Sequence, residues 1–352
     1  MTINPPISVP SLLSRRRFSA HTRAFLQKIA KLGLTFGFLP LLLPATAQIP
    51  NAPLTKSQAG YYRSMVGDVE VISLSDGTIP LSAYDFLTNT THAKIEILLA
   101  AADVTNPVNV PVNGYLVHLG SHVILIDAGA GALYGPKLGK LEASLVIVGY
   151  QPEQITDIVL THIHPDHTGG LVNGQTRVFP NAIVHLDKRE LDYWFSNANA
   201  DSAPQGQKGF FQQAIQTIKP YVDAGRVKTF DGATELFPGF RSIPAPGHTP
   251  GHTFYSLESK GARLIFWGDV LHEEDVQFPD PSVTVAFDVN PAEAMQTRKA
   301  AFADAANKGY LIAPAHINFP GIGHVRAEGD HYRWLPVPYV NDAVAANAVA
   351  QK

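Results

Sequence analysis

The sequence predicts one α/β domain in which two β-sheets pack together and helices cover the outside. The chain has 352 residues, of which 45% are hydrophobic, so it is long enough to bury a large core. It contains 28 Gly and 27 Pro, and this number of turn-forming residues argues against a helical bundle. Strand-like and helix-like segments follow in the order strands, helices, strands, helix, without a break that would separate two domains.

The strand predictions rest on short apolar runs bounded by turn residues. Gly120-Ser121 joins two such runs and predicts a hairpin, and Asp76-Gly77-Thr78 predicts a turn that ends the first strand. The expected strands are 69–74, 115–119, 123–126, 158–160, 182–186 and 264–267.

The helix predictions rest on spacing and on end signals. Residues 138–148 place four apolar side chains on one helical face, and Gly149 is typical of a helix end. Asn290 can cap a helix that has Pro291 at its first position, and this helix should end at Gly309. Two further helices are expected at 187–197 and 209–218.

The first 47 residues have the pattern of a secretory signal peptide. They hold six basic and no acidic residues, then an apolar run at 32–44, and then Ala45-Thr46-Ala47, a typical cleavage site. The apolar run is shorter than the roughly 20 residues that cross a membrane. Residues 14–18 also fit a twin-arginine signal, and a retained interfacial anchor is a further alternative. We expect a periplasmic or secreted protein.

Removal of this leader predicts an acidic mature chain. Of 27 basic residues, six are lost, so 21 remain against 30 acidic ones and the formal charge changes from −3 to −9. This argues against nucleic-acid binding, which needs a basic surface, and no stretch suggests stable membrane insertion. The expected organisation is a signal peptide at 1–47, an extended segment at 48–60, the domain at 61–340 and a tail at 341–352.

The strongest functional signal is the run HIHPDH at 162–167, which follows an apolar strand. In an extended chain His162 and His164 point the same way, because side chains alternate with a period of two. The proline then turns the chain, so that Asp166 and His167 can face a second point. The spacing therefore offers two half-sites for metal ions, whereas a polar turn without metal would leave several costly unpaired groups.

Three more residues of the ligand type follow apolar runs, namely His248, Asp269 and His316. The chain has 14 His and no Cys, so a metal site must use imidazole and carboxylate ligands. Such ligands suit zinc, although cobalt, manganese or iron could also bind.

Together these segments resemble the metallo-β-lactamase superfamily, whose HxHxDH motif matches residues 162–167. The resemblance implies a four-layer αββα sandwich with the site at one edge. It also implies that His162, His164 and His248 bind one metal ion, that Asp166, His167 and His316 bind a second, and that Asp269 bridges both.

Further stretches are similar to methyl parathion hydrolase and its relatives, over nearly all of residues 55–338. These stretches are 60–63, 74–78, 149–154, 208–211, 276–278, 280–283, 301–306 and 319–324.

The same resemblance implies an apolar substrate pocket, although each aromatic residue assigned to it could instead be ordinary core. In organophosphate-degrading relatives, the pocket wall after the bridging Asp is expected to be apolar. Here His272, Glu273 and Glu274 make that wall polar, and Phe287 is bulkier than expected at its position. Asp127 is expected to hold a ligand imidazole in its correct tautomer, or else to cap a turn. The expected pocket residues are Tyr134, Trp194, Phe210, Phe211, His272 and Phe287.

The expected function is that of an exported hydrolase with two divalent ions, most simply Zn²⁺, and with Asp166 and Asp269 as catalytic residues. A bridging hydroxide would attack a lactone or aryl ester that carries a bulky apolar group, since a metal lowers the pKa of bound water to roughly 7. A phosphotriesterase is the alternative, and a non-catalytic metal-binding protein on the same fold is a weaker one. The expected partner is a small-molecule ester, lactone or phosphotriester, and a homodimer is left open.

Overall fold

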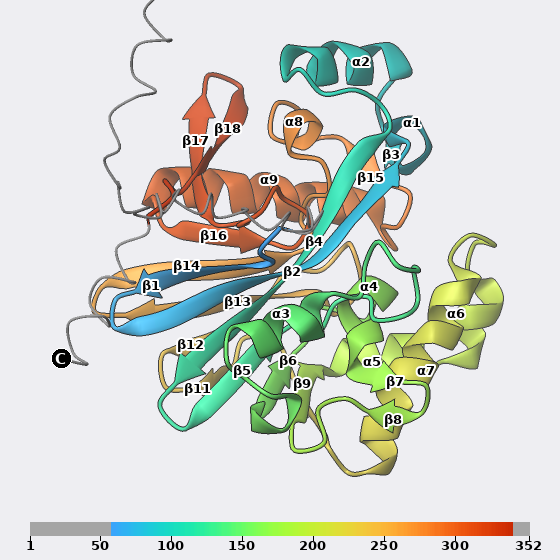
Figure 1. Cartoon of the computed structure of the whole chain (residues 1–352). Coiled ribbons are helices and arrows are strands. Elements are labelled where there is room, and N and C mark those ends of the chain that lie inside the picture. Colours follow the sequence, from blue (N-terminus) through green and yellow to red (C-terminus); the bar gives the residue numbers. More distant parts are fainter. Residues whose placement is uncertain (1–57, 341–352) are drawn as a thin grey trace, which may run out of the picture. The chain divides into compact units, whose positions relative to one another are not determined.

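Residues 58–340 are described by a computed structural model; the leader, residues 48–57 and the tail 341–352 lie outside them. Within the described residues, two seven-stranded sheets pack face to face (Figure 1). The first sheet has the order β1 (Tyr61–Val66), β2 (Val69–Leu81), β4 (Val108–Leu119), β5 (His122–Ile126), β6 (Asp157–Val159), β9 (Ile183–Asp187) and β10 (Val227–Phe230). The second has the order β11 (Glu235–Phe237), β12 (Phe240–Pro244), β13 (Thr253–Ser259), β14 (Ala262–Gly268), β16 (Leu311–Pro314), β17 (Gly323–Glu328) and β18 (His331–Pro336).

Helices cover the outer faces of both sheets. The α-helices are α1 (Ala83–Phe86), α2 (His92–Ala101), α3 (Leu141–Ile147), α4 (Pro165–Thr168), α5 (Lys188–Trp194), α6 (Asn197–Ser202), α7 (Lys208–Asp223), α8 (Glu274–Gln277) and α9 (Pro291–Lys308). Short 3-10 turns lie at η2 (Pro152–Gln154) and η3 (Gly169–Leu171), and two small ribbons pair β3 (Leu87–Thr88) with β15 (Thr284–Val285) and β7 (Val172–Asn173) with β8 (Thr176–Arg177).

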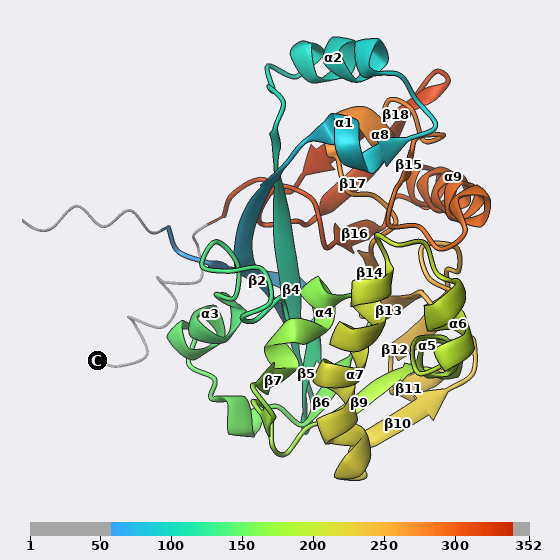
Figure 2. The same cartoon turned by 90° about the vertical axis from the view of Figure 1, so that its right-hand side faces the viewer.

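The alternation of side chains along each strand produces the layers. In β5, Ile124 and Ile126 face the second sheet, whereas Leu125 packs with residues of α3, α5 and α7. In β14, Phe266 faces the first sheet, and Trp267 stacks on Phe302 of α9. The four-layer αββα sandwich predicted for this chain is therefore confirmed; Figure 2 shows α3 and α9 on its two outer sides.

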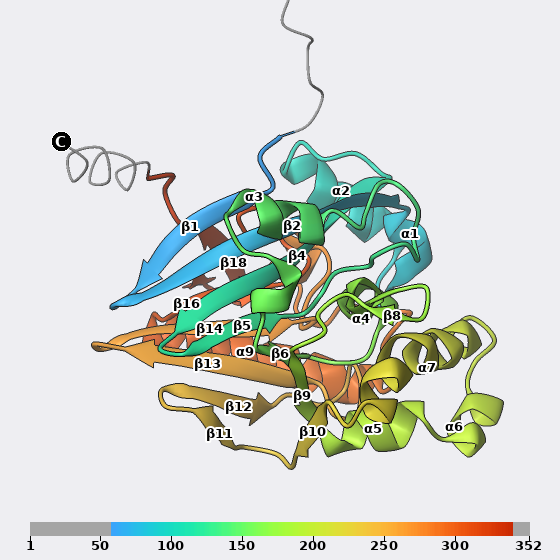
Figure 3. The same ribbon diagram turned by 60° about the horizontal axis from the view of Figure 1, so that its bottom comes forward.

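The first sheet runs from β1 at one edge to β10 at the other, as Figure 3 shows. Its long strands β2 and β4 pair antiparallel, from Val71 opposite Val117 to Leu81 opposite Val108. They carry α1 and α2 at their far end (Figures 1 and 2). This extension brings aliphatic side chains of both strands beside the site described below.

Two local predictions were wrong. The predicted turn at residues 76–78 is a register shift inside β2, which continues to Leu81, because the side chain of Asp76 finds buried backbone partners elsewhere. The helix predicted at 187–197 ends early: α5 stops at Trp194, and a separate helix, α6, begins at Asn197 with Ser196 as its N-cap. The hairpin of β4 and β5 and the helix α9, which ends before Gly309, are confirmed.

Across residues 58–340, the helices are too short or too polar to cross a bilayer.

Candidate metal centre

The run 162–167 leaves the end of β6 in an extended conformation and then enters α4. The rings of His162 and His164 lie 4.6 Å apart, and Ile163 between them is buried in the core. His164 is the N-cap residue of α4 and Pro165 its first residue, so the next side chains follow on a helical turn. This one short segment can therefore supply ligand side chains to two separate metal sites.

Strand ends of the second sheet bring the remaining ligand-type residues. His248 lies in the loop between β12 and β13, Asp269 follows β14 and His316 follows β16. In each of two groups the ligand atoms lie within 4.8 Å of one another, and Asp269 belongs to both. The first group is His162, His164, His248 and Asp269, and the second group is Asp166, His167, Asp269 and His316.

Asp269 lies in the middle of this cluster. Its Oδ1 is 3.0 Å from Nε2 of His167. Its Oδ2 is 3.1 Å from Nε2 of His316 and 3.2 Å from Nε2 of His248. Its backbone N–H donates to Nε2 of His252, so His252 fixes the position of Asp269 and belongs to neither ligand group.

In three of the imidazoles, Nδ1, the ring nitrogen that points away from Asp269, faces an oxygen that can only accept a hydrogen bond. Each neutral ring therefore carries its proton on Nδ1 and turns the lone pair of Nε2 toward Asp269, which is itself only an acceptor. The pairs, with their Nδ1–oxygen distances, are His167 with Asp127 (2.9 Å), His248 with Asp288 (2.8 Å) and His316 with the carbonyl of Pro111 (2.8 Å).

When these rings are neutral, their lone pairs converge on Asp269 without a proton donor between them, so either a protonated ring or a bound metal ion must compensate. Among the described residues, Nε2 of His162, Nε2 of His167 and Oδ1 of Asp269 are buried and have no hydrogen-bond partner. Burial of such atoms is costly unless a cation binds them. Imidazoles and carboxylates in this number suit divalent ions such as zinc, so the residues fit two metal ions.

The electrostatics of the cluster also favour bound positive charge. Burial acts to raise the pKa of Asp269, but the imidazoles of His167, His316 and His162 hold it well below its usual range. Burial acts to lower the pKa of His248, yet Asp269 and Asp288 raise it to about 9. Either protons or metal ions could supply this positive charge. Metal ions would in addition bind several of the convergent lone pairs at once.

Asp127 contacts a ligand imidazole, as the sequence predicted for this position. Its Oδ2 accepts from Nδ1 of His167 and from the hydroxyl of Thr161, and its Oδ1 accepts from the backbone N–H of Thr161. Sequence reasoning missed Asp288, which holds His248 in the same way. No local pattern distinguishes Asp288 from an ordinary loop aspartate.

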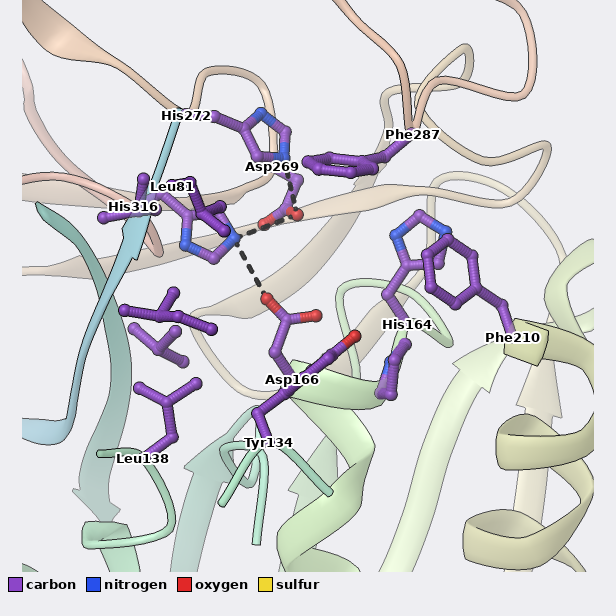
Figure 4. Close-up of a pocket in the computed structure, with 14 residues that line it drawn as sticks. Leu81, Tyr134, Leu138, His164, Asp166, Phe210, Asp269, His272, Phe287 and His316 are labelled. Carbon is purple, nitrogen blue, oxygen red and sulfur yellow. Dashed lines mark hydrogen bonds and ion pairs between the residues drawn. The ribbon is translucent and has the colours of Figure 1, made fainter. Parts of the chain in front are cut away.

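An apolar cavity of about 250 Å³ opens onto both ligand groups (Figure 4). Phe210 and Phe287 lie on one side of it in this view, and Leu81 and Leu138 on the other. Of the predicted pocket residues, Tyr134, Phe210, His272 and Phe287 line the cavity. Sequence reasoning missed the aliphatic wall formed by Ile79, Leu81, Val110, Val112 and Leu138.

Two predicted pocket residues lie elsewhere. Trp194 and Phe211 are not among the residues that line the cavity; both are buried in the core between α5 and α7, with ring centroids 4.7 Å apart. They are turned inward because their helices pack these faces against the first sheet. Trp194 reaches the site only indirectly, through an edge contact with His164 at 5.2 Å between ring centroids.

The predicted polar wall consists of His272 alone. Its Nε2 is 3.1 Å from Oδ2 of Asp269, and burial lowers its pKa to about 4 despite that carboxylate, so the ring is neutral at pH 7. Glu273 caps α8 and Glu274 accepts hydrogen bonds from Asn318, and neither lines the cavity.

Comparisons with known proteins agree with this geometry. The family model of the metallo-beta-lactamase superfamily matches residues 108–316. The hydrolase AbOPH of the beta lactamase superfamily is 36% identical, with a TM-score of 0.78 over 81% of this chain and 100% of that one. AidC, a dizinc quorum-quenching lactonase solved with the product N-hexanoyl-L-homoserine, is 27% identical, with a TM-score of 0.75 over 80% of this chain and 99% of that one.

The N-acyl homoserine lactonase of Bacillus cereus is 27% identical over 179 residues, which are 46% of this chain and 63% of the lactonase. The chain thus spans less than two thirds of the length of the curated relatives that it matches first.

Proposed function

The chain belongs to the metallo-β-lactamase superfamily, and from this premise we propose that it is a hydrolase with two divalent metal ions that cleaves lactones or aryl esters. One observation carries the proposal: the two ligand groups share Asp269 and open onto an apolar cavity. The likeness to AidC, a dizinc lactonase, supports it.

The seven ligand residues would hold the two ions, with zinc as the proposed metal. When bound, such ions supply Lewis acidity and make hydroxide available near neutral pH. Asp269 places its negative charge between the two groups. Asp166 is the most open ligand, with 21% of its side chain exposed, and it lines the cavity, so its carboxylate lies where the substrate would enter.

The walls of the cavity suit a flat ester with an apolar substituent. Phe210 lies 5.0 Å from His164 and Phe287 lies 5.9 Å from His272, measured between ring centroids. These aromatic rings face the aliphatic wall across the ligand residues (Figure 4). An aryl or acyl group would be held between the two walls by burial and stacking.

A phosphotriester is the alternative substrate, because the same ligand groups and apolar walls could hold one. His272 and Phe287, however, occupy the wall beside Asp269. These two side chains narrow the cavity beside Asp269, which favours a substrate with a planar carbonyl over one with a tetrahedral phosphorus centre.

A panel of substrates tests the proposal. Metal-loaded protein should hydrolyse dihydrocoumarin, an aryl acetate and N-hexanoyl homoserine lactone faster than methyl paraoxon, and a chelator should stop all turnover. Fast turnover of methyl paraoxon alone would favour the phosphotriesterase. Failure to hydrolyse any of the four would favour the non-catalytic alternative.

We also propose that the protein is exported, because residues 1–47 have the pattern of a signal peptide. Amino-terminal sequencing of the protein recovered from the periplasm or the medium should begin at Gln48. Recovery of the full-length chain only from the cytoplasm would contradict export.

A further inference from the structure

Glu190, the third residue of α5, is a fully buried carboxylate beside the metal centre. Its Oε2 accepts hydrogen bonds from the backbone N–H of Ile163 at 2.8 Å and from the indole N–H of Trp194 at 2.9 Å. Its Oε1 accepts from the backbone N–H of Gly251 at 2.8 Å. Among the described residues no Lys or Arg forms a salt bridge with Glu190. Burial raises its pKa, and hydrogen-bond donors, the hydroxyl of Thr249 among them, act against that rise.

The two backbone donors belong to the two loops that carry the imidazoles of the first ligand group. Ile163 lies between His162 and His164, so its N–H fixes the extended segment from which both rings project. Gly251 lies three residues after His248, in the loop between β12 and β13. One carboxylate therefore ties together two loops that come from different sheets.

The third donor reaches the same group by another route. The ring of Trp194, held by Glu190, packs edge-on against His164 at 5.2 Å between centroids. The loop at Gly251 comes so close that a Cβ there would lie 2.7 Å from the backbone nitrogen of Glu190 and 2.9 Å from its Cγ. Only glycine allows this approach without displacement of the carboxylate.

The second ligand group is held by different atoms. Asp127 fixes His167, and the carbonyl of Pro111 fixes His316. Neither of these contacts involves Glu190.

We propose that Glu190 is a positioning residue for the first ligand group, His162, His164, His248 and Asp269, and that the second group binds its ion independently of Glu190. The inference rests on the proposed two-ion centre. It predicts a one-sided effect, whereas a purely structural carboxylate would weaken both groups or neither.

The test uses two parent variants, each of which retains one complete group. His316→Ala leaves the first group intact, and His248→Ala leaves the second. Glu190→Gln is added to each parent, because glutamine keeps the size but replaces one accepting oxygen with an NH₂ group that cannot accept from an N–H. The affinity for Zn²⁺ is measured by competition with a chromophoric chelator, and the visible spectrum of bound Co²⁺ reports the ligand geometry.

In the His316→Ala parent, we expect Glu190→Gln to lower the Zn²⁺ affinity about tenfold or more and to alter the Co²⁺ spectrum. Substitution of residues that support metal ligands commonly has an effect of this size. In the His248→Ala parent the affinity should change less than about twofold. Equal losses in both parents, or no loss in the first, would overturn the role of Glu190. Parents that bind no Zn²⁺ would overturn the two-ion centre itself.

Asp187→Asn is the matched control, because Asp187 is a buried carboxylate that caps the same helix without contact to either loop. It should leave both affinities unchanged. If Glu190→Gln does not fold, Gly251→Ala takes its place, since the added Cβ presses on Glu190. Gly251→Ala should reproduce the one-sided loss, and wild-type affinity in the His316→Ala parent would reject the proposal.

Discussion

At the level of single residues, the centre depends most on Asp269, the ligand common to both groups. We expect Asp269→Ala to abolish hydrolysis and to lower the bound metal below two ions per chain, because both groups lose a carboxylate while their imidazoles remain. Elemental analysis and the initial rate check this. A variant with full metal content and a normal rate would show that Asp269 does not bridge.

His272 controls which substrate fits beside Asp269. We expect His272→Leu to raise the ratio of methyl paraoxon to dihydrocoumarin hydrolysis about tenfold, since loss of the neutral imidazole leaves an apolar wall, and a tenfold change needs only about 1.4 kcal/mol. His331→Leu, at an exposed position that does not line the cavity, is the control. An unchanged ratio would remove His272 from the account of specificity.

Asp288 sets the proton position on His248. Its Oδ1 faces Nδ1 of His248, and its Oδ2 accepts from the backbone N–H of Val285, so an asparagine can satisfy only one of these contacts. We expect Asp288→Asn to lower metal affinity about 10- to 100-fold. Chelator competition measures this, with Asp330→Asn at a fully exposed position as the control. Unchanged affinity would mean that the tautomer of His248 is set in another way.

Among the elements, β2 and the loop at 128–140 act as one unit. The buried carboxylate of Asp76, within β2, accepts from the backbone N–H groups of Ala130, Gly139 and Leu141 and so closes the loop that carries Tyr134 and Leu138 into the cavity.

We expect Asp76→Ala to lower the free energy of unfolding by about 3 kcal/mol, because three buried donors lose their acceptor. The KM for apolar esters should rise as the loop loosens. Denaturant unfolding and limited proteolysis measure these effects, and Asp68→Ala, at an exposed aspartate before β2, is the control. Resistance to proteolysis equal to that of the wild type would contradict the anchoring role.

The contrast between elements explains what the sequence could predict. The run 162–167 was accessible because its geometry is local: alternation directs two histidines to one side, and a proline begins a helix. The Asp-Gly pair at 76–77 has the local pattern of a turn, yet the partners of Asp76 lie 54 to 65 residues away and keep the strand continuous. Contacts between residues so far apart in the sequence cannot be predicted from a local sequence pattern.

The cavity was predicted less well for the same reason. An aromatic residue on a helix can face a pocket or the core, and only the packing of α5 and α7 decides that Phe210 does the first and Phe211 the second. The aliphatic wall comes from the far ends of β2 and β4, whose continuation past the predicted turn was not foreseen. The superfamily resemblance supplied the layer order, whereas the residues alone indicated two sheets with outer helices.

In the whole molecule, the metal centre joins the two sheets. Four ligands follow β6 of the first sheet, and three follow strands of the second. Bound ions would therefore tie together two halves of the sandwich that otherwise meet through an apolar core, so binding should stabilise the entire fold rather than one loop.

Removal of the metal should thus lower the melting temperature. An ion present at 1,000 times its dissociation constant contributes about 4 kcal/mol, which for a domain of this size corresponds to about 10 °C. We expect a chelator to lower Tm by this order and added Zn²⁺ to restore it. Asp269→Ala should show a smaller chelator-induced fall in Tm than the wild type, because it binds less metal. A wild-type Tm that is insensitive to both chelator and Zn²⁺ would show that no ion links the sheets, since a ligand that binds only the folded state must shift its unfolding.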